Sequence, residues 1–349
     1  MFLWFRYGHS KAMLRNHILK IRMGLQMELY EKSAIQRNDW VRWYLPLALL
    51  LFCIALILSP EHERAQFFIF LLIPCIPAMM KAEERPRSYF WAAAFLGIAY
   101  YVLNMLVFKM HVWQLKYELV HPNGLFDFLI PMNQFLHSIP FNDGMFIRQF
   151  ATPWLDQILV PIYVHGFVVP AAVMAVYYVA TKQPVKVVQA IFAFHALQYV
   201  MILPFHFWVE SYQVWQVQNM FDGTFFTDPI VNYRHWLVSG AKVPSFNHAF
   251  PSMHTSIATA IIIMALREKN RFFRWIMVIF NVTVIFTTVY LGIHWILDLM
   301  GGILLGWSAV KIGDWVVTRP TFQLWINQFI ERIERVLPER KSKKEMVRA

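Results

Sequence analysis

The chain has 349 residues, of which 58% are hydrophobic and only 15% are charged. Soluble domains average about 45–50% apolar and about 25% charged residues, so this composition excludes a soluble globular protein, a disordered chain, collagen and a coiled coil. The two cysteines, Cys53 and Cys75, both lie in apolar runs; they cannot form a disulfide framework and are expected to pack. What remains is a polytopic membrane protein, provided that the apolar residues form spans of about 20 residues.

The apolar residues are grouped in this way, and they predict an all-α membrane protein with eight spans. The second span is short and carries Pro74 and Pro77, which predict a kinked, tilted or partly re-entrant segment. The predicted spans are residues 43–59, 66–80, 89–108, 157–180, 187–208, 251–266, 275–292 and 296–317.

Lys and Arg are concentrated on one side of the predicted membrane, with twenty-five residues there against six on the other. Positive residues resist translocation, so both termini are predicted to be cytoplasmic. Residues 1–42 are expected to form a cytoplasmic, partly amphipathic segment on the membrane surface and not a cleaved leader, and residues 318–349 a basic cytoplasmic tail. Two long segments on the outer side, 109–156 and 209–250, are rich in aromatic and turn residues and are expected to lie on the outer leaflet.

The net charge of +11 raises the question of a nucleic-acid partner. The positive residues adjoin the predicted spans, where anionic lipid head groups attract them. We therefore predict anionic lipid head groups at the cytoplasmic surface as partners, and no nucleic acid. The sequence carries no internal repeat and no indication of oligomeric state.

The segment FNHAFPSMHTS is predicted to open the sixth span on the outer side. Pro251 lacks an N–H and has a fixed φ, so it suits the first helical position. The amides of Ser252, Met253 and His254 would then point outward from the positive end of a helix dipole. Such an end attracts anions, so the sequence predicts an anion site around His254.

Forty residues after His254, the segment YLGIHWILDLMGG carries His294 and Asp298, which share one face of a helix because they are four residues apart. A carboxylate there can accept the imidazole N–H, fix the tautomer and leave the other nitrogen to attack or to take a proton. The predicted topology places His254 and His294 at the same membrane face. The spacing of the two segments does not require this shared face, so the shared face is independent support for a catalytic site.

Each feature taken singly has an ordinary structural explanation. A histidine at a membrane boundary can anchor the chain, and Asp298 can complement the start of a helix. Together, on one face and beside an anion site, the residues favour catalysis. A metal site of two histidines and one aspartate is an alternative, but zinc takes three firm ligands plus water. No third histidine stands at a recognised ligand spacing, so we predict no metal and no cofactor.

Pro251-Ser252-Met253-His254, followed by His294-x-x-x-Asp298, resembles the second and third motifs of the phosphatidic acid phosphatase type 2 superfamily, P-S-G-H and S-R-x5-H-x3-D. The first motif of that superfamily is K-x6-R-P. Within it, the segments AFPSMHTS and TTVYLGIHWILDLMGG are most similar to the inositol phosphorylceramide synthase branch. The resemblance covers about residues 90–317. It implies a six-helix catalytic core over 89–317, preceded by two additional spans within 43–88.

The resemblance also implies a metal-independent mechanism. His294 attacks the phosphorus to form a phosphohistidine and is oriented by Asp298. His254 protonates the leaving alcohol and then acts as base for the incoming one, while Ser252 and the helix amides hold the phosphate oxygens. Covalent and acid–base catalysis divide one difficult step into two easier ones.

The chain departs from the family pattern at the residues that hold phosphate. Thr288 stands where the third motif has its Arg, Met253 replaces the Gly of the second motif, and the first motif is absent after the fifth span. A transferred phosphoryl group needs positive charge around it, so other residues must supply that charge. The outer-side candidates are Arg234, His235, Lys242 and His248.

The function expected from these features is that of a membrane-embedded lipid phosphotransferase, which moves a phospho-head group to a lipid alcohol at the extracytoplasmic face. That face would be the outside of a bacterial plasma membrane or the lumenal face of a eukaryotic internal membrane, and the substrates would be lipids within the bilayer. Loss of the motif Arg in the lipid-synthase branches favours transfer. A lipid phosphate phosphatase, with water as the acceptor, is the first alternative. A lipid transporter or flippase is the second, although its ionisable groups would lie near the midplane.

Overall fold

The structure is a computed structural model, and it describes residues 71–80, 85–120, 129–223, 227–231 and 248–337. The chain divides into two units, Met1–Pro60 and Glu61–Ala349, and every described residue belongs to the second. The expected surface segment at 1–42 and the first predicted span at 43–59 lie outside the described residues.

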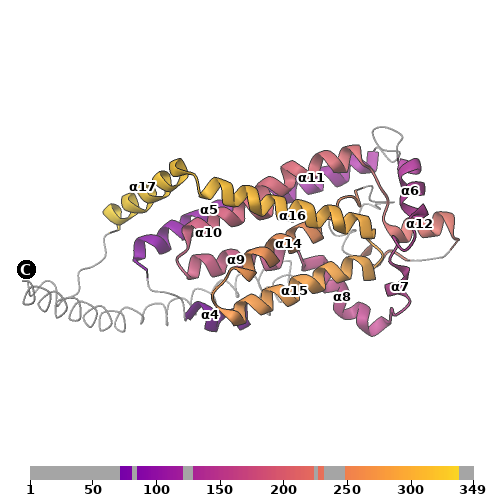
Figure 1. The fold of residues 1–349 in the computed structure, drawn as a ribbon, viewed down its shortest axis with the longest axis horizontal. Coiled ribbons are helices and arrows are strands. Elements are labelled where there is room, and N and C mark those ends of the chain that lie inside the picture. Colours follow the sequence, from indigo (N-terminus) through magenta and orange to yellow (C-terminus); the bar gives the residue numbers. More distant parts are fainter. Residues whose placement is uncertain (1–70, 81–84, 121–128, 224–226, 232–247, 338–349) are drawn as a thin grey trace, which may run out of the picture. The chain divides into compact units, whose positions relative to one another are not determined.

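The second unit is built from helices, which confirms the prediction of an all-α fold (Figure 1). In the described residues, β-type pairing is limited to one isolated bridge between Ser211 and His248. The helices are η1 (Ile73–Cys75), α4 (Ile76–Met80), α5 (Arg87–Val120), α6 (Leu129–Ser138), α7 (Met145–Arg148), α8 (Pro153–His165), α9 (Val168–Ala180), α10 (Pro184–Ile191), the π-helical turn η2 (Phe192–Ala196), α11 (Leu197–Trp208), α12 (Val214–Phe221), α14 (Met253–Leu266), α15 (Arg271–Tyr290), α16 (Ile296–Val317) and α17 (Pro320–Val336).

Four helical stretches of the described chain are long and apolar enough to cross a membrane, which identifies an integral membrane protein. They are Arg87–Leu106 in α5, Pro184–Phe207 through α10 and α11, α15 and α16. The pair α8 and α9 is bent by 57° and counts as a fifth span if it crosses as one. The helix α14 has 14 residues and is shorter than a span, so the six-helix core stays a prediction.

Three helices differ from the expected boundaries. Helix α5 runs to Val120, well past the predicted end at 108, because neither Gly nor Pro occurs between residue 108 and Pro122. The predicted outer segment 109–156 therefore begins as helix. Pro74 lies in the 3₁₀ turn η1, which interrupts the described part of the second span. Within the predicted tail, α17 forms an amphipathic helix whose buried face packs against α5.

Helix α14 packs against both α15 and α16. Its approach to α16 is close because Gly302 and Gly306 face it. A Cβ at Gly302 would lie 2.6 Å from the carbonyl oxygen of Ser252, and one at Gly306 would overlap the carbonyl oxygen of Ser256. Small residues that let helix backbones approach are common in membrane proteins. Here they bring the first turn of α14 against the first turns of α16.

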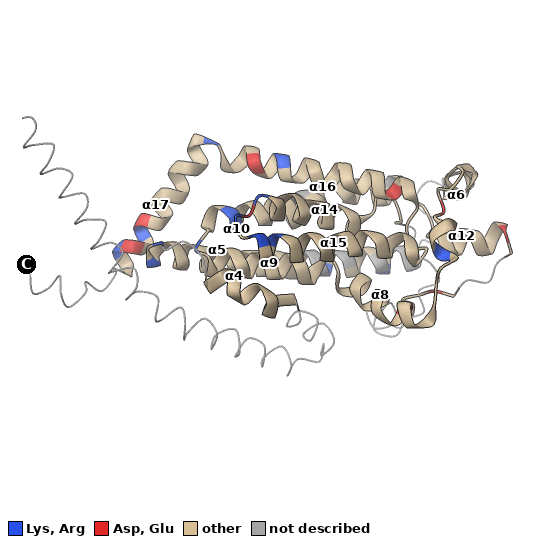
Figure 2. Cartoon of the chain, turned by 60° about the horizontal axis from the view of Figure 1, so that its bottom comes forward, with Lys and Arg blue, Asp and Glu red and all other residues tan. Residues whose placement is uncertain are grey.

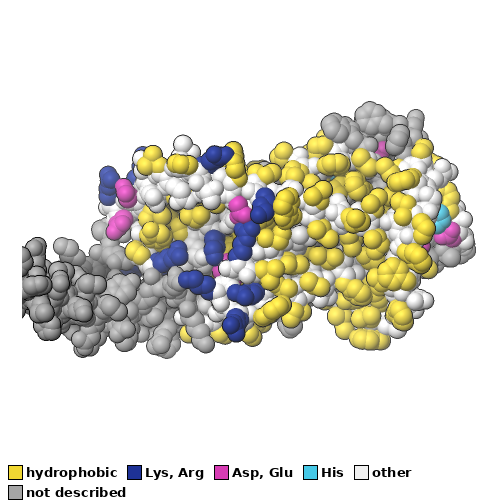
Figure 3. Space-filling view, in the orientation of Figure 1, with side chains coloured by type: hydrophobic (Ala, Val, Ile, Leu, Met, Phe, Trp, Pro, Cys, Tyr) yellow, Lys and Arg dark blue, Asp and Glu magenta, His cyan; other side chains and the backbone are white. Residues whose placement is uncertain are grey.

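The two ends of the bundle differ in charge. The short helices α6, α7 and α12 lie together at one end, on the right in Figure 1. Most Lys and Arg side chains of the described residues gather toward the other end (Figures 2 and 3), and apolar side chains cover the face between. Those at the basic end include Arg85, Arg87, Lys182, Lys186, Arg267, Lys269, Arg271, Arg274 and Arg319. The positive residues make this basic end the expected cytoplasmic end, and the orientation stays a prediction.

Candidate active site

The first turn of α14 is organised by Ser252. Its Oγ accepts a hydrogen bond from the Thr255 amide at 3.2 Å, and its own amide donates to the carbonyl oxygen of Asp298 at 3.2 Å. Ser252 is therefore the N-cap, and the helix begins at Met253. The expectation that Pro251 occupies the first helical position was wrong, because the serine side chain satisfies an orphan amide that proline cannot.

His294 lies in the turn between α15 and α16, two residues before the first residue of α16. Its Nδ1 is 2.9 Å from the carbonyl oxygen of Ala249 and 3.4 Å from Oδ2 of Asp298. That same Oδ2 accepts the amide of Trp295 at 2.9 Å. Since a carbonyl oxygen can only accept, the contact with Ala249 assigns a proton to Nδ1 and leaves the lone pair on Nε2.

His254 lies beside His294, as the spacing and topology predicted. The centroids of the two rings are 6.5 Å apart. His254 Nε2 is 3.1 Å from the carbonyl oxygen of Tyr163, and its ring stacks on the Tyr163 ring at 4.0 Å. The structure thus brings together Ser252, His254, His294 and Asp298 at the end of the bundle that holds α6, α7 and α12.

The position that carries Arg in the family motif has another role here. Thr288 is fully buried, and its hydroxyl donates to the carbonyl oxygen of Ile285 at 2.7 Å. Its own carbonyl accepts the amides of Ile293 and His294, each at 3.1 Å. Thr288 therefore closes the turn that presents His294, and positive charge for a phosphate must come from another residue.

Four residues were expected to supply positive charge for a phosphate, and the structure describes only one of them, His248. Its ring centroid lies 5.1 Å from that of His206. His206 Nε2 in turn lies 3.4 Å from the carbonyl oxygen of Pro251, directly before the N-cap of α14. His248 is therefore close to the segment that leads into the site. Arg234, His235 and Lys242 lie outside the described residues, so their role stays a prediction.

Sequence reasoning missed Asn142, which lies in the predicted outer segment 109–156. The carbonyl oxygen of Asn142 accepts the amide of Ile296 at 2.8 Å, and its Oδ1 accepts the amide of Leu297 at 2.9 Å. Its Nδ2 donates to the carbonyl oxygen of Leu136 at 2.8 Å. The predicted outer segment 109–156 therefore caps α16 and holds the helix that carries Asp298.

Arg148 of α7 was also missed. Its guanidinium donates to Gln218 Oε1 at 3.0 Å and lies against Gly292, where a Cβ would come within 2.5 Å of Nη1. Burial lowers the pKa of Arg148, and the negative charges of Asp156 and Asp143 oppose that change. Gly292 has a φ of +64°, so glycine is favoured both by the backbone conformation and by the guanidinium. Arg148 thereby supports the turn before His294.

Among the described residues, no group of three or more His, Cys, Asp or Glu side chains is arranged to hold a metal ion. The described site consists of paired imidazoles next to a helix N-terminus. Two imidazoles so placed can serve as a nucleophile and a general acid–base partner.

The fold and the site together define a helical membrane protein with a paired-histidine centre at one end of its bundle. The family model described as the PAP2 superfamily matches residues 199–319, a stretch that contains most of α11, all of α14, α15 and α16, and the residues His254, His294 and Asp298. The match supports the superfamily indicated by the motifs and points to a membrane enzyme of phosphatase or phosphotransferase type that acts on phosphoesters. No curated protein and no solved structure matches the chain.

Proposed function

We propose that the protein is a lipid phosphotransferase of the inositol phosphorylceramide synthase type, which moves a phospho-head group to a lipid alcohol at the extracytoplasmic face. The observation that carries the proposal is the pairing of His254 and His294, with ring centroids 6.5 Å apart at the first turns of α14 and α16. A phosphoryl group between two imidazoles can be attacked by one and exchange a proton with the other.

The first step forms a phosphohistidine. Nε2 of His294 attacks the phosphorus with its lone pair while Nδ1–H stays bound to the carbonyl of Ala249 and faces Asp298. The bond from phosphorus to the leaving oxygen breaks, and protonated His254 gives its proton to that oxygen. The donor lipid leaves as an alcohol, and the cation that forms on His294 is stabilised by the negative charge of Asp298.

The second step reverses these roles. The hydroxyl of the acceptor lipid loses its proton to His254 as its oxygen attacks the phosphorus. The phosphorus–nitrogen bond breaks and returns the electron pair to Nε2 of His294. Transfer requires that water be a poor acceptor, so the site must be shielded while the phosphohistidine exists. The segments of α6, α7 and α12 that surround this end of the bundle are suited to such shielding.

The phosphate oxygens would be held by several weak groups. The Ser252 oxygen caps α14, but its hydroxyl hydrogen can still be donated to a ligand. The N-terminus of α14 adds its positive dipole end. We propose that His248, Arg234, His235 and Lys242 supply the positive charge, since position 288 does not.

A lipid phosphate phosphatase remains the first alternative, because the same histidine pair would pass the phosphoryl group to water. A transporter or flippase is disfavoured by position: His254, His294 and Asp298 lie in the first turn or the preceding turn of their helices, whereas transport sites lie near the midplane on broken helices.

The deciding experiment incubates purified protein with a labelled phospholipid, with and without ceramide or diacylglycerol. Transfer predicts a new labelled phospholipid only when the lipid alcohol is present. His254→Ala and His294→Ala should each abolish it, since one variant removes the proton carrier and the other the nucleophile. Steady release of inorganic phosphate, unaffected by the alcohol, would establish the phosphatase instead.

A further inference from the structure

The helix pair α8 and α9 is interrupted directly beside the candidate site. Helix α8 ends at His165, and the two helices meet at an angle of 57°. The amide of Gly166 donates to the carbonyl oxygen of Tyr163 at 3.1 Å, which closes a tight turn at the end of α8. This break was not predicted, because residues 157–180 form one continuous apolar run.

Gly166 makes the break possible. A Cβ at Gly166 would overlap the carbonyl oxygen of Ile162 and would lie 2.8 Å and 3.0 Å from the two γ-carbons of Val284 on α15. Any larger residue would therefore force the end of α8 away from α15. Sharp kinks in helices have identifiable causes, and here a glycine fits between its own preceding turn and the Val284 side chain.

The break directs both the backbone and the side chain of Tyr163 toward His254. The Tyr163 carbonyl oxygen is 3.1 Å from His254 Nε2. The Tyr163 ring lies parallel to the imidazole, with centroids 4.0 Å apart and an interplanar angle of 18°. Phe167, in the residues that link α8 to α9, meets the imidazole edge-on at 5.0 Å. Three contacts from one short segment therefore fix the plane and the rotation of this ring.

These contacts have a chemical consequence. A carbonyl oxygen only accepts hydrogen bonds, so Nε2 of His254 carries a proton in both the neutral and the charged imidazole. Proton exchange with a substrate then falls to Nδ1. An aromatic face also attracts a cation, so the stacked Tyr163 ring suits the imidazolium that a general acid requires.

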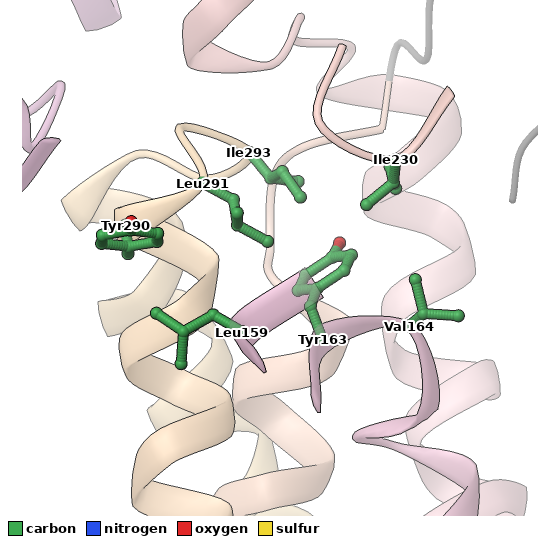
Figure 4. Packing of buried hydrophobic residues seen from close by; sticks show 7 residues of the cluster. All are labelled: Leu159, Tyr163, Val164, Ile230, Tyr290, Leu291 and Ile293. Carbon is green, nitrogen blue, oxygen red and sulfur yellow. The ribbon is translucent and has the colours of Figure 1, made fainter. Parts of the chain in front are cut away.

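Tyr163 also contacts the other half of the site. It belongs to a buried cluster with Leu291 and Ile293, which lie in the turn that leads to His294. Figure 4 shows the Tyr163 ring next to these two side chains. A displacement of Tyr163 would therefore disturb both histidines.

We propose that Tyr163, presented by the α8–α9 break, is a positioning residue that fixes the tautomer and orientation of His254 so that Nδ1 faces the substrate. The part of this proposal that concerns catalysis rests on the proposed function. The part that concerns the tautomer does not rest on it, because the tautomer of His254 can be measured without an activity assay.

The direct test is ¹⁵N NMR of the full chain labelled at histidine and held in lipid nanodiscs, with His254→Gln used to assign the His254 signals. We expect the wild-type protein to show a proton on Nε2 of neutral His254. A proton on Nδ1 would overturn the proposal. This measurement needs no substitution in α8, so a variant that fails to fold cannot leave the question open.

Gly166→Ala tests the break itself. The added methyl must move the Tyr163 carbonyl, so we expect the neutral His254 signals to become a mixture of tautomers. We also expect kcat to fall by about 10²-fold with KM nearly unchanged, because a misplacement of about 1 Å impairs chemistry and not binding. Gly97→Ala is the matched control: its methyl would meet a single γ-carbon of Val179 at 3.1 Å, far along the chain from the site, and should leave both readouts at wild-type values.

Two further variants test the contribution of the Tyr163 ring separately from that of the Tyr163 carbonyl. Tyr163→Phe keeps both and should retain the tautomer and kcat, whereas Tyr163→Leu loses the stacked ring and should lower kcat with little change in KM. Equal kcat in the Leu and Phe variants would contradict a positioning role for the ring.

The positioning role and the proposed function can fail independently. If the Nε2–H tautomer is observed but the protein does not transfer phosphate, the positioning role holds and the proposed function fails. Transfer with the opposite tautomer would support the proposed function and overturn the positioning role.

Discussion

The carbonyl oxygen of Ala249 lies 2.9 Å from Nδ1 of His294, closer than the carboxylate of Asp298 at 3.4 Å. The backbone of the segment before α14 therefore sets the tautomer of the proposed nucleophile. The carboxylate shares this task and also accepts the amide of Trp295. Asp298 thus joins the start of α16 to His294, and its charge balances the cation that forms on the ring.

This geometry predicts that Asp298→Asn retains some activity. When an aspartate alone fixes the tautomer, its change to asparagine costs about 10⁴-fold. Here Ala249 still holds Nδ1–H, and an asparagine oxygen can still accept the Trp295 amide, so the loss of kcat should be well below that value. Transfer assays on Asp298→Asn, with His294→Ala as the inactive reference, measure the difference. Activity as low as that of His294→Ala would show that the Ala249 contact does not suffice.

The proposed mechanism uses only protein groups, so chelators should not change the rate. Incubation of purified protein with EDTA, followed by removal of the chelator and a transfer assay, should leave kcat within experimental error of the untreated sample. Inactivation by EDTA that is reversed by added zinc would favour the alternative in which His254, His294 and Asp298 serve as metal ligands.

The sequence was informative where function depends on residues close together in the chain. His294 and Asp298 are one helical turn apart, and a proline and a serine mark the start of α14, so both halves of the site could be recognised locally. The bounds of α16 were predicted as observed for the same reason, since residues 296–317 form a mostly apolar stretch without proline.

The supporting residues could not be predicted in this way. Ala249 and Tyr163 act through backbone carbonyls, which every residue has, and Asn142 lies 155 residues before its partner Leu297. Such contacts arise from tertiary packing and leave no local pattern. Pro161, Gly166 and Pro170 were the available signals for the α8–α9 break, and the apolar residues around them concealed it.

The proposed orientation predicts which positions an outside reagent can reach. Gln149 is exposed at the end of the bundle that holds the site, and Lys269 is exposed at the opposite, basic end. In a variant without Cys53 and Cys75, a membrane-impermeant thiol reagent applied to intact cells should label Gln149→Cys and miss Lys269→Cys until the membrane is permeabilised. The opposite pattern would place the histidines at the cytoplasmic face and both termini outside.

The cap that Asn142 places on α16 predicts a loss of stability as well as activity. Asn142→Ala removes the acceptor of the Leu297 amide, and loss of such a side-chain cap costs about 1 kcal/mol, within a range of about 0.5–2 kcal/mol. The side chain is buried, so water cannot readily replace it, and we expect the upper half of this range in the free energy of unfolding. The start of α16 carries Asp298 and follows His294 closely, so kcat should fall as well.

Ser138→Ala is the matched control in the same predicted outer segment. Its hydroxyl bonds to the carbonyl of Phe135 at an exposed position, and its loss should change stability by less than about 0.5 kcal/mol. Thermal unfolding in nanodiscs and transfer assays on both variants check the expectation, and equal behaviour of the two variants would show that the outer segment does not hold the catalytic helix.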